Sequence, residues 1–149
     1  MERKVNMNKA YKIGYIAGMF DILHAGHIHI LKFAKSQCDH LIVAVGTDEF
    51  MLSRKGRSSV MPYDERVEIV RAIRYVDEVV PETDLNKIGE YNKYHFDVMF
   101  SGDDHIHEET YIRATDELKK LGVDTIYVPR VKNISSTNVR ESIRNGNLK

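Results

Sequence analysis

The 149-residue chain has one cysteine, no tryptophan, no net charge and no long apolar segment. A single cysteine, Cys38, can form neither an intramolecular disulfide nor a thiolate zinc site, and it fits a reducing cytoplasm. Lys+Arg and Asp+Glu both total 22, so no basic surface for nucleic acid is expected. No apolar run approaches the about 18 residues of a membrane span, and the basic N-terminus lacks the apolar core of a secretory signal. These absences predict a cytoplasmic protein with neither nucleic acid nor a membrane among its partners.

What the chain does contain is an alternation of short apolar runs with longer amphipathic stretches. The runs predict strands at Tyr11–Gly18, His40–Gly46, Glu78–Pro81, Asp97–Gly102 and Asp124–Pro129. The stretches predict helices at His27–Gln37, Pro62–Val76, Asp84–His95, Glu108–Gly122 and Ser135–Gly146. This alternation predicts one α/β domain over residues 1–149: a Rossmann-like, doubly wound, mostly parallel five-stranded sheet with helices on both faces. Residues 1–10 are expected to form a loose N-terminal extension.

Ligands of such sheets bind at the carboxyl ends of the strands, near the point where the strand order reverses. This rule selects four loops, Gly18–Gly26, Gly46–Ser59, Ser101–Glu108 and Pro129–Thr137. The unusual residues of the sequence are concentrated in these loops, which predicts a site where they meet.

The first loop, GMFDILHAGH, places His24 and His27 at the predicted start of a helix. A helix N-terminus attracts anions, because its backbone N–H groups are free and the helix dipole is positive there. Gly18 and Gly26 let a ligand or another backbone come close. The two imidazoles add hydrogen-bond donors, and beside a polyphosphate their pKa should rise from about 6.5 towards the charged form.

Two other interpretations of these histidines stay open. His24 and His27 could be metal ligands, although no cysteine pair or HExxH pattern supplies the further ligands that zinc requires. They could also be core or solvated histidines that meet by coincidence. His29 follows at a spacing that points to another side of the helix, so it is expected to be a surface or packing residue.

The other three loops carry charged or hydroxyl side chains. Composition alone favours a solvated loop for the basic stretch Arg54–Arg57. The acids that follow Gly102 could cap the next helix or bind ribose hydroxyls or Mg²⁺. The hydroxyls of Ser135–Thr137 could form a plain N-cap or, with helix N–H groups, could cradle phosphates.

At this point the residues resemble a known family. GMFDILHAGH is similar to GxFDxxHxGH, the first signature of the HxGH nucleotidyltransferase superfamily. The run from Lys55 to Pro81, with RYVDEVVP, and the later GDD are similar to the cytidylyltransferase branch, especially to bacterial enzymes that act on glycerol 3-phosphate. The fourth loop resembles the second signature, Arg-Thr-x-Gly-Ile-Ser-Thr-Thr, through Arg130, Ile134, Ser135 and Thr137. The resemblance extends from Lys12 to about Ile143.

The resemblance implies a nucleotidyltransferase domain that uses CTP with Mg²⁺ as a homodimer. It implies CMP transfer to a small phosphorylated alcohol, first of all glycerol 3-phosphate, giving CDP-glycerol and pyrophosphate by direct in-line displacement. The implied catalytic residues are His24, His27 and Arg130. The implied acceptor-phosphate contacts are Arg54, Lys55 and Lys87. The implied nucleotide contacts are Gly18, Met19, Phe20, Asp21, Ala25, Gly26, Arg74, Gly102, Asp104, Ile134, Ser135, Ser136 and Thr137. The Mg²⁺ ligands are not assigned.

Some residues depart from the cytidylyltransferase pattern and keep alternatives open. Met19 replaces a common threonine, His105 a tryptophan and Asn133 a glycine. ISST also resembles the adenylyltransferase branch of the superfamily, which uses ATP. A nucleotide-binding regulator without turnover is a further alternative.

The acceptor is open as well, because phosphocholine, phosphoethanolamine or another polyol phosphate could take the place of glycerol 3-phosphate. A choline group would require an aromatic cage, and the site loops offer only Phe20 and Phe50 with Tyr63 nearby. For Arg74, the alternative to a site role is a surface ion pair with Asp77.

Overall fold

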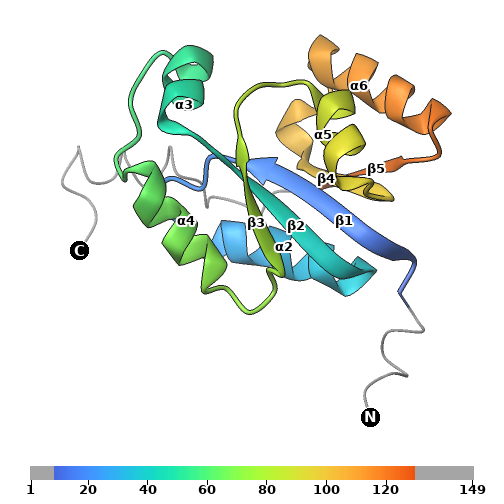
Figure 1. Ribbon diagram of the computed structural model, residues 1–149, viewed down its shortest axis with the longest axis horizontal. Helices are drawn as coiled ribbons and strands as arrows, with labels where there is room; N and C mark the ends of the chain where they lie inside the picture. The colour runs from blue at the N-terminus through green and yellow to red at the C-terminus, as the bar shows by residue number, and fades with distance from the viewer. Residues whose placement is uncertain (1–8, 130–149) are drawn as a thin grey trace.

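A computed structural model describes residues 9–129 of the protein (Figure 1). The order of elements is β1 (Tyr11–Gly18), α2 (Ala25–Gln37), β2 (Cys38–Gly46), α3 (Asp48–Lys55), α4 (Tyr63–Arg71), β3 (Glu78–Glu82), α5 (Lys87–Tyr94), β4 (Val98–Gly102), the 3₁₀ turn η1 (Asp103–His105), α6 (Glu109–Lys120) and β5 (Asp124–Val128). The predicted helix Ser135–Gly146 lies outside the described residues. Within residues 9–129, no helix is both long and apolar enough to cross a membrane.

The five strands are all parallel, in the order β3-β2-β1-β4-β5. The chain moves outward from β1 to β3 and then returns to the other side of β1, so the strand order reverses between β1 and β4. This confirms the predicted Rossmann-like α/β class, and the sheet is parallel throughout rather than mostly parallel. β3 continues through Pro81, which an edge strand tolerates because it has a ladder on one side only.

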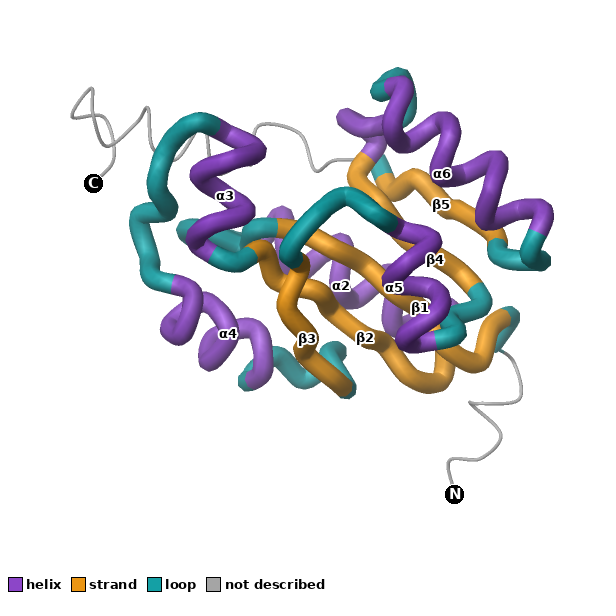
Figure 2. The backbone as a smooth tube through the Cα atoms, turned by 45° about the horizontal axis from the view of Figure 1, so that its top comes forward, coloured by secondary structure: helices purple, strands orange, loops and turns teal. Residues whose placement is uncertain are grey.

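Helices cover both faces of the sheet, and each face has its own core (Figure 2). Tyr15 and Ile16 are neighbours on β1 and enter opposite cores, as the period of two in a strand requires. Ile16 shares its core with α2 and α4, through Leu31 and Val70. Tyr15 shares the second core with α6, through Leu118. The sheet is therefore buried on both sides, and the ends of its strands are left for a site.

Helices α3 and α4 depart most from what the sequence predicts. Helix α3 occupies part of Gly46–Ser59, which was predicted to be a loop. Thr47 caps it by accepting a hydrogen bond from the Phe50 N–H (3.1 Å), and Gly56, with a φ of 72°, ends it in the left-handed region. Helix α4 ends at Arg71, earlier than predicted, and short turns lead from there to β3.

Candidate active site

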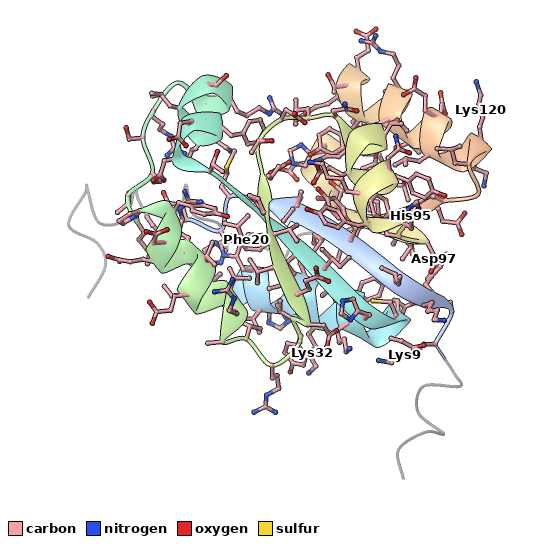
Figure 3. The ribbon with its side chains drawn as sticks, viewed as in Figure 1. Lys9, Phe20, Lys32, His95, Asp97 and Lys120 are labelled. Carbon is pink, nitrogen blue, oxygen red and sulfur yellow. The ribbon has the colours of Figure 1, made fainter. Side chains whose placement is uncertain are left out.

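The loop between β1 and α2 turns sharply at two non-glycine residues. Phe20 and Ile22 have φ angles of 54° and 52°, a region that such residues seldom adopt. Phe20 points into the core beside the sheet (Figure 3), and the buried carboxylate of Asp21 holds the other side of the loop. Asp21 accepts hydrogen bonds from the N–H groups of Val60 (2.8 Å) and Met61 (3.0 Å). These contacts on both sides maintain a backbone that is strained locally.

His24 and His27 cap the start of α2 by reciprocal hydrogen bonds. Nδ1 of His24 accepts from the Gly26 N–H (3.0 Å), and Nδ1 of His27 accepts from the His24 N–H (3.1 Å). The two ring centroids are 4.1 Å apart. Because each Nδ1 is an acceptor, a neutral ring must carry its proton on Nε2. The pair therefore offers two Nε2–H donors to an anion.

The protein keeps both rings neutral at pH 7. Burial lowers the pKa of His24 below its ordinary value. Burial, and next the nearby His24, lower the pKa of His27 to about 4, against an opposing effect of Asp21. The predicted rise of the pKa towards the charged form therefore requires the negative charge of a bound polyphosphate.

A buried arginine that sequence reasoning missed organises the adjacent backbone. Arg66 on α4 is fully buried and donates hydrogen bonds to the carbonyl oxygens of Met19 (2.7 Å), Gly46 (2.7 Å) and Met61 (2.9 Å), and to Oδ1 of Asp48 (2.7 Å). It thereby joins the ends of β1 and β2 to the start of α4. The signal available in the sequence was the place of Arg66 on the buried face of an amphipathic helix. A charge buried there needs a full set of hydrogen-bond partners, which marks the residue as structural.

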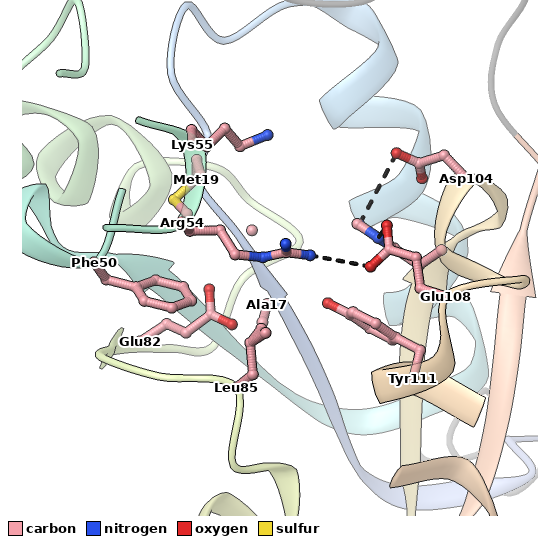
Figure 4. A pocket seen from close by; sticks show the side chains of 12 residues that line it. Ala17, Met19, Phe50, Arg54, Lys55, Glu82, Leu85, Asp104, Glu108 and Tyr111 are labelled. Atoms are coloured by element: carbon pink, nitrogen blue, oxygen red, sulfur yellow. Dashed lines mark hydrogen bonds and ion pairs between the residues drawn. The ribbon is translucent and has the colours of Figure 1, made fainter. Parts of the chain in front are cut away.

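A cavity of about 270 Å³ opens beside these loops, between α3 and the segment that follows β4 (Figure 4). It lies at the carboxyl ends of β1 and β3, close to the point where the strand order reverses. Five of the predicted site residues line it: Gly18, Met19, Arg54, Lys55 and Asp104. The cavity therefore shares its wall with the loop that carries the two histidines.

A chain of polar contacts between side chains crosses this cavity. Nη2 of Arg54 lies 3.0 Å from Oε1 of Glu108, and Oε2 of Glu108 lies 2.9 Å from Nδ1 of His105. The ring of His105 stacks on Tyr111, with centroids 4.5 Å apart. Burial acts to raise the pKa of Glu108, but its bonds to His105 and Arg54 lower that pKa overall. An anionic Glu108 therefore neutralises Arg54 in the protein itself.

Two predicted contacts are placed away from the cavity surface. Lys87 is 3% exposed, and its Nζ lies 2.7 Å from Oε2 of Glu82 in a buried ion pair. Arg74 is exposed in the turn between α4 and β3, at the amino edge of the sheet, so one chain does not bring it to the histidines. Its alternative partner Asp77 pairs instead with Lys35, at 2.6 Å.

The remaining predicted residues are placed as follows. Ala25 and Gly26 lie in the first turn of α2, Gly102 ends β4, and His29 is exposed, as expected. The predicted residues outside the described part of the chain are Arg130, Ile134, Ser135, Ser136 and Thr137. In the range 9–129, no group of three or more His, Cys, Asp or Glu side chains is placed to hold a metal ion.

A parallel, doubly wound sheet with paired imidazole donors at its switch point defines a Rossmann-like protein suited to binding phosphate-bearing small molecules. The sequence profile described as cytidylyltransferase-like matches residues 15–142. The chain therefore belongs to the cytidylyltransferase-like family of nucleotidyltransferases, which confirms the resemblance predicted from its motifs.

Individual relatives give two kinds of similarity. The chain is 38% identical over 127 residues to a glycerol-3-phosphate cytidylyltransferase of Bacillus subtilis (strain 168), covering 85% of this chain and 92% of the relative. It is also 57% identical to an FAD synthase of Pyrococcus abyssi over 65 residues, 44% of each chain. The fold is shared with a crystal structure described as the lipopolysaccharide core biosynthesis protein from Thermoplasma volcanium, with a TM-score of 0.67 and 24% identity over 82% of this chain and 98% of that one.

Proposed function

We propose that this protein transfers CMP from CTP to a small phosphorylated alcohol, with glycerol 3-phosphate as the first candidate. The observation that carries the proposal is the pair of Nε2–H donors that His24 and His27 present at the start of α2. The similarity to a glycerol-3-phosphate cytidylyltransferase along most of both chains supports the choice of nucleotide and acceptor.

The proposed reaction is a direct in-line displacement. An oxygen of the acceptor phosphate forms a bond to the α-phosphorus of CTP, while the bond from that phosphorus to the α,β-bridging oxygen breaks. The electron pair of that bond leaves with pyrophosphate. A phosphate monoester has its second pKa near about 6, so the nucleophile is ionised at neutral pH without a general base. Catalysis then consists of positioning the reactants and stabilising charge.

His24 and His27 donate hydrogen bonds to phosphate oxygens of the nucleotide as negative charge moves to the leaving pyrophosphate. Arg54 and Lys55 hold the acceptor phosphate, and both line the cavity beside the histidine loop. The resemblance assigns the far end of the triphosphate to Arg130 and the hydroxyls that follow it.

Mg²⁺, a homodimer and a cytoplasmic location belong to the same proposal. Mg²⁺ keeps several waters and binds through substrate phosphates with few protein ligands. The lack of a three-ligand cluster among residues 9–129 is compatible with such a site. When bound, the ion would neutralise charge on the triphosphate.

A second candidate is nucleotidyl transfer from ATP. The 57% identity with an FAD synthase over 44% of the chain favours it. FAD consists of AMP joined to FMN, so the acceptor of this reaction would be FMN.

The deciding experiment measures pyrophosphate release with Mg²⁺ for each pairing of CTP or ATP with glycerol 3-phosphate, phosphocholine, phosphoethanolamine or FMN. We expect release with CTP and glycerol 3-phosphate, and CDP-glycerol as the product by mass spectrometry. Release only with ATP and FMN would replace the first candidate by the second. No release from any pairing would refute nucleotidyl transfer to these acceptors.

A further inference from the structure

Two buried polar groups face each other across the inner end of the cavity. Glu82 ends β3 and is 3% exposed, whereas Tyr111 belongs to α6 and is 7% exposed. Both line the cavity, and Figure 4 shows their polar ends directed into the space beside Arg54. These groups come from elements that are far apart in the sequence, so the fold alone brings them together.

Neither group has its hydrogen-bonding capacity filled by the part of the chain that is described. Oε2 of Glu82 binds Lys87, but Oε1 has no hydrogen-bond partner among residues 9–129. The hydroxyl of Tyr111 has none in that range either, although its ring stacks on His105. Buried polar groups are almost always hydrogen-bonded. An acceptor and a hydroxyl that both point into one cavity therefore indicate a ligand with matching polar groups.

The charges around this space favour a neutral ligand group. The Glu82 carboxylate is already paired with the Lys87 ammonium at 2.7 Å, with side chains 4% and 2% exposed. A quaternary ammonium would thus find no uncompensated anion in Glu82. The aromatic rings that line the cavity are those of Phe50, Tyr111 and His105. A ligand hydroxyl fits better, because it can donate a hydrogen bond to Oε1 of Glu82 and accept one from the hydroxyl of Tyr111.

We propose that Glu82 and Tyr111 form a subsite that recognises the hydroxyl groups of a phosphorylated polyol, whose phosphate lies against Arg54. This inference rests on the proposed function and names its acceptor class. The cavity volume of about 270 Å³ is slightly below the about 300–1,000 Å³ of pockets for drug-sized ligands, which suits a short polyol. The same chemistry is present in a free polyol phosphate and in the ribityl phosphate of FMN.

The sharpest variant is Tyr111→Phe, which removes one hydroxyl and keeps the ring that stacks on His105. The matched control is Tyr91→Phe, because Tyr91 belongs to α5, its ring packs against the second core, and it does not line the cavity. Each protein is assayed with CTP and either glycerol 3-phosphate or propyl phosphate, which lacks the hydroxyls. A site built to bind a hydroxyl rejects the analogue that lacks it, so we expect wild type to favour glycerol 3-phosphate by about tenfold or more in kcat/KM.

Tyr111→Phe should reduce kcat/KM for glycerol 3-phosphate by about tenfold, mainly through KM, and leave the value for propyl phosphate unchanged. Tyr91→Phe should change neither value. An equal loss on both acceptors, or an unchanged ratio, would overturn the inference. So would a preference of the wild type for phosphocholine over glycerol 3-phosphate, although nucleotidyl transfer itself would then stand.

Calorimetric binding of the same two acceptors separates this inference from the proposed function, because it needs no turnover. If no nucleotide and acceptor release pyrophosphate, the proposed function fails, but a binding preference for glycerol 3-phosphate that Tyr111→Phe abolishes still supports the subsite. Equal binding of glycerol 3-phosphate and propyl phosphate overturns it. Comparing ribitol 5-phosphate with FMN then distinguishes a free polyol from a flavin nucleotide as the source of the polyol chain.

Discussion

Replacing His27 with asparagine separates two roles of one ring, the helix cap that the structure shows and the phosphate donor that we propose. Nδ1 of His27 accepts the His24 N–H at the start of α2, while Nε2 is the donor assigned to the phosphates. An asparagine Oδ1 takes about the place of Nδ1, so His27→Asn keeps the acceptor and removes the donor. His27→Gln does the reverse, because its amide nitrogen reaches about the place of Nε2.

The two roles have different magnitudes. Loss of one preorganised donor to a transition state typically lowers kcat by about 10²–10³. Loss of a helix-capping acceptor costs about 0.5–2 kcal/mol of stability. At about 2–4 °C per kcal/mol for a chain of this size, that loss would lower Tm by about 1–8 °C. His27→Asn should therefore lose about 10²–10³ in kcat with little change in Tm, and His27→Gln should recover part of the rate.

The assay is steady-state pyrophosphate release with saturating CTP and glycerol 3-phosphate, combined with thermal melting of each variant. His29→Asn is the matched control, since this exposed histidine lies on the same helix and should change neither kcat nor Tm. The reasoning is refuted if His27→Asn loses less than about tenfold in kcat. It is also refuted if the loss of rate merely follows a loss of folded protein.

Three further predictions concern stability, pH and the acceptor. Arg66→Met removes the four hydrogen bonds of a buried guanidinium, so the free energy of unfolding should fall by about 3–5 kcal/mol in urea denaturation. A loss below about 1 kcal/mol would contradict the network. Because the pKa of His27 is about 4 in the folded protein and about 6.5 in the unfolded chain, the unfolded state takes up the proton first as pH falls. Stability should be full above about pH 6.5 and decline by up to about 3 kcal/mol towards pH 4, and His27→Asn should flatten this part of the Tm–pH curve. Glu108→Gln removes the negative charge that competes with the acceptor phosphate for Arg54. KM for the acceptor phosphate should therefore fall by about 1.5- to 5-fold in initial-rate assays. An increase in this KM would show instead that Glu108 helps to bind the acceptor.

The strands were predictable because their sequence patterns are local. The run that forms β2 is apolar at consecutive positions, and Ile42 and Val43 indeed enter opposite cores. Helix α3 was missed because only Phe50 and Met51 of its eight residues are buried, which gives a weak amphipathic pattern. Its boundaries were nevertheless readable, since Thr47 is a good N-cap.

The candidate site divides in the same way between local and distant partners. His24 and His27 were found because the residues they cap lie within one turn of helix. The pairing of Arg54 with Glu108 was not found, because the two residues are 54 positions apart and meet only through the order of the strands. The inward direction of Tyr111 depends on how α6 packs on the sheet, which no spacing in the sequence records.

The network of Arg66 has a mechanical consequence for the cavity. On one side, a fully buried guanidinium ties the ends of β1 and β2 to α4 by hydrogen bonds of 2.7–2.9 Å. On the other side, the ion pair of Arg54 with Glu108 reaches the segment after β4, and its side chains are 32% and 40% exposed. Exposed pairs of this kind contribute only about 0–1 kcal/mol, whereas disrupting the buried network costs several times more. The buried network of Arg66 should therefore keep its shape when a substrate binds, whereas the contact of Arg54 with Glu108 can open at little cost and release the guanidinium to an incoming phosphate.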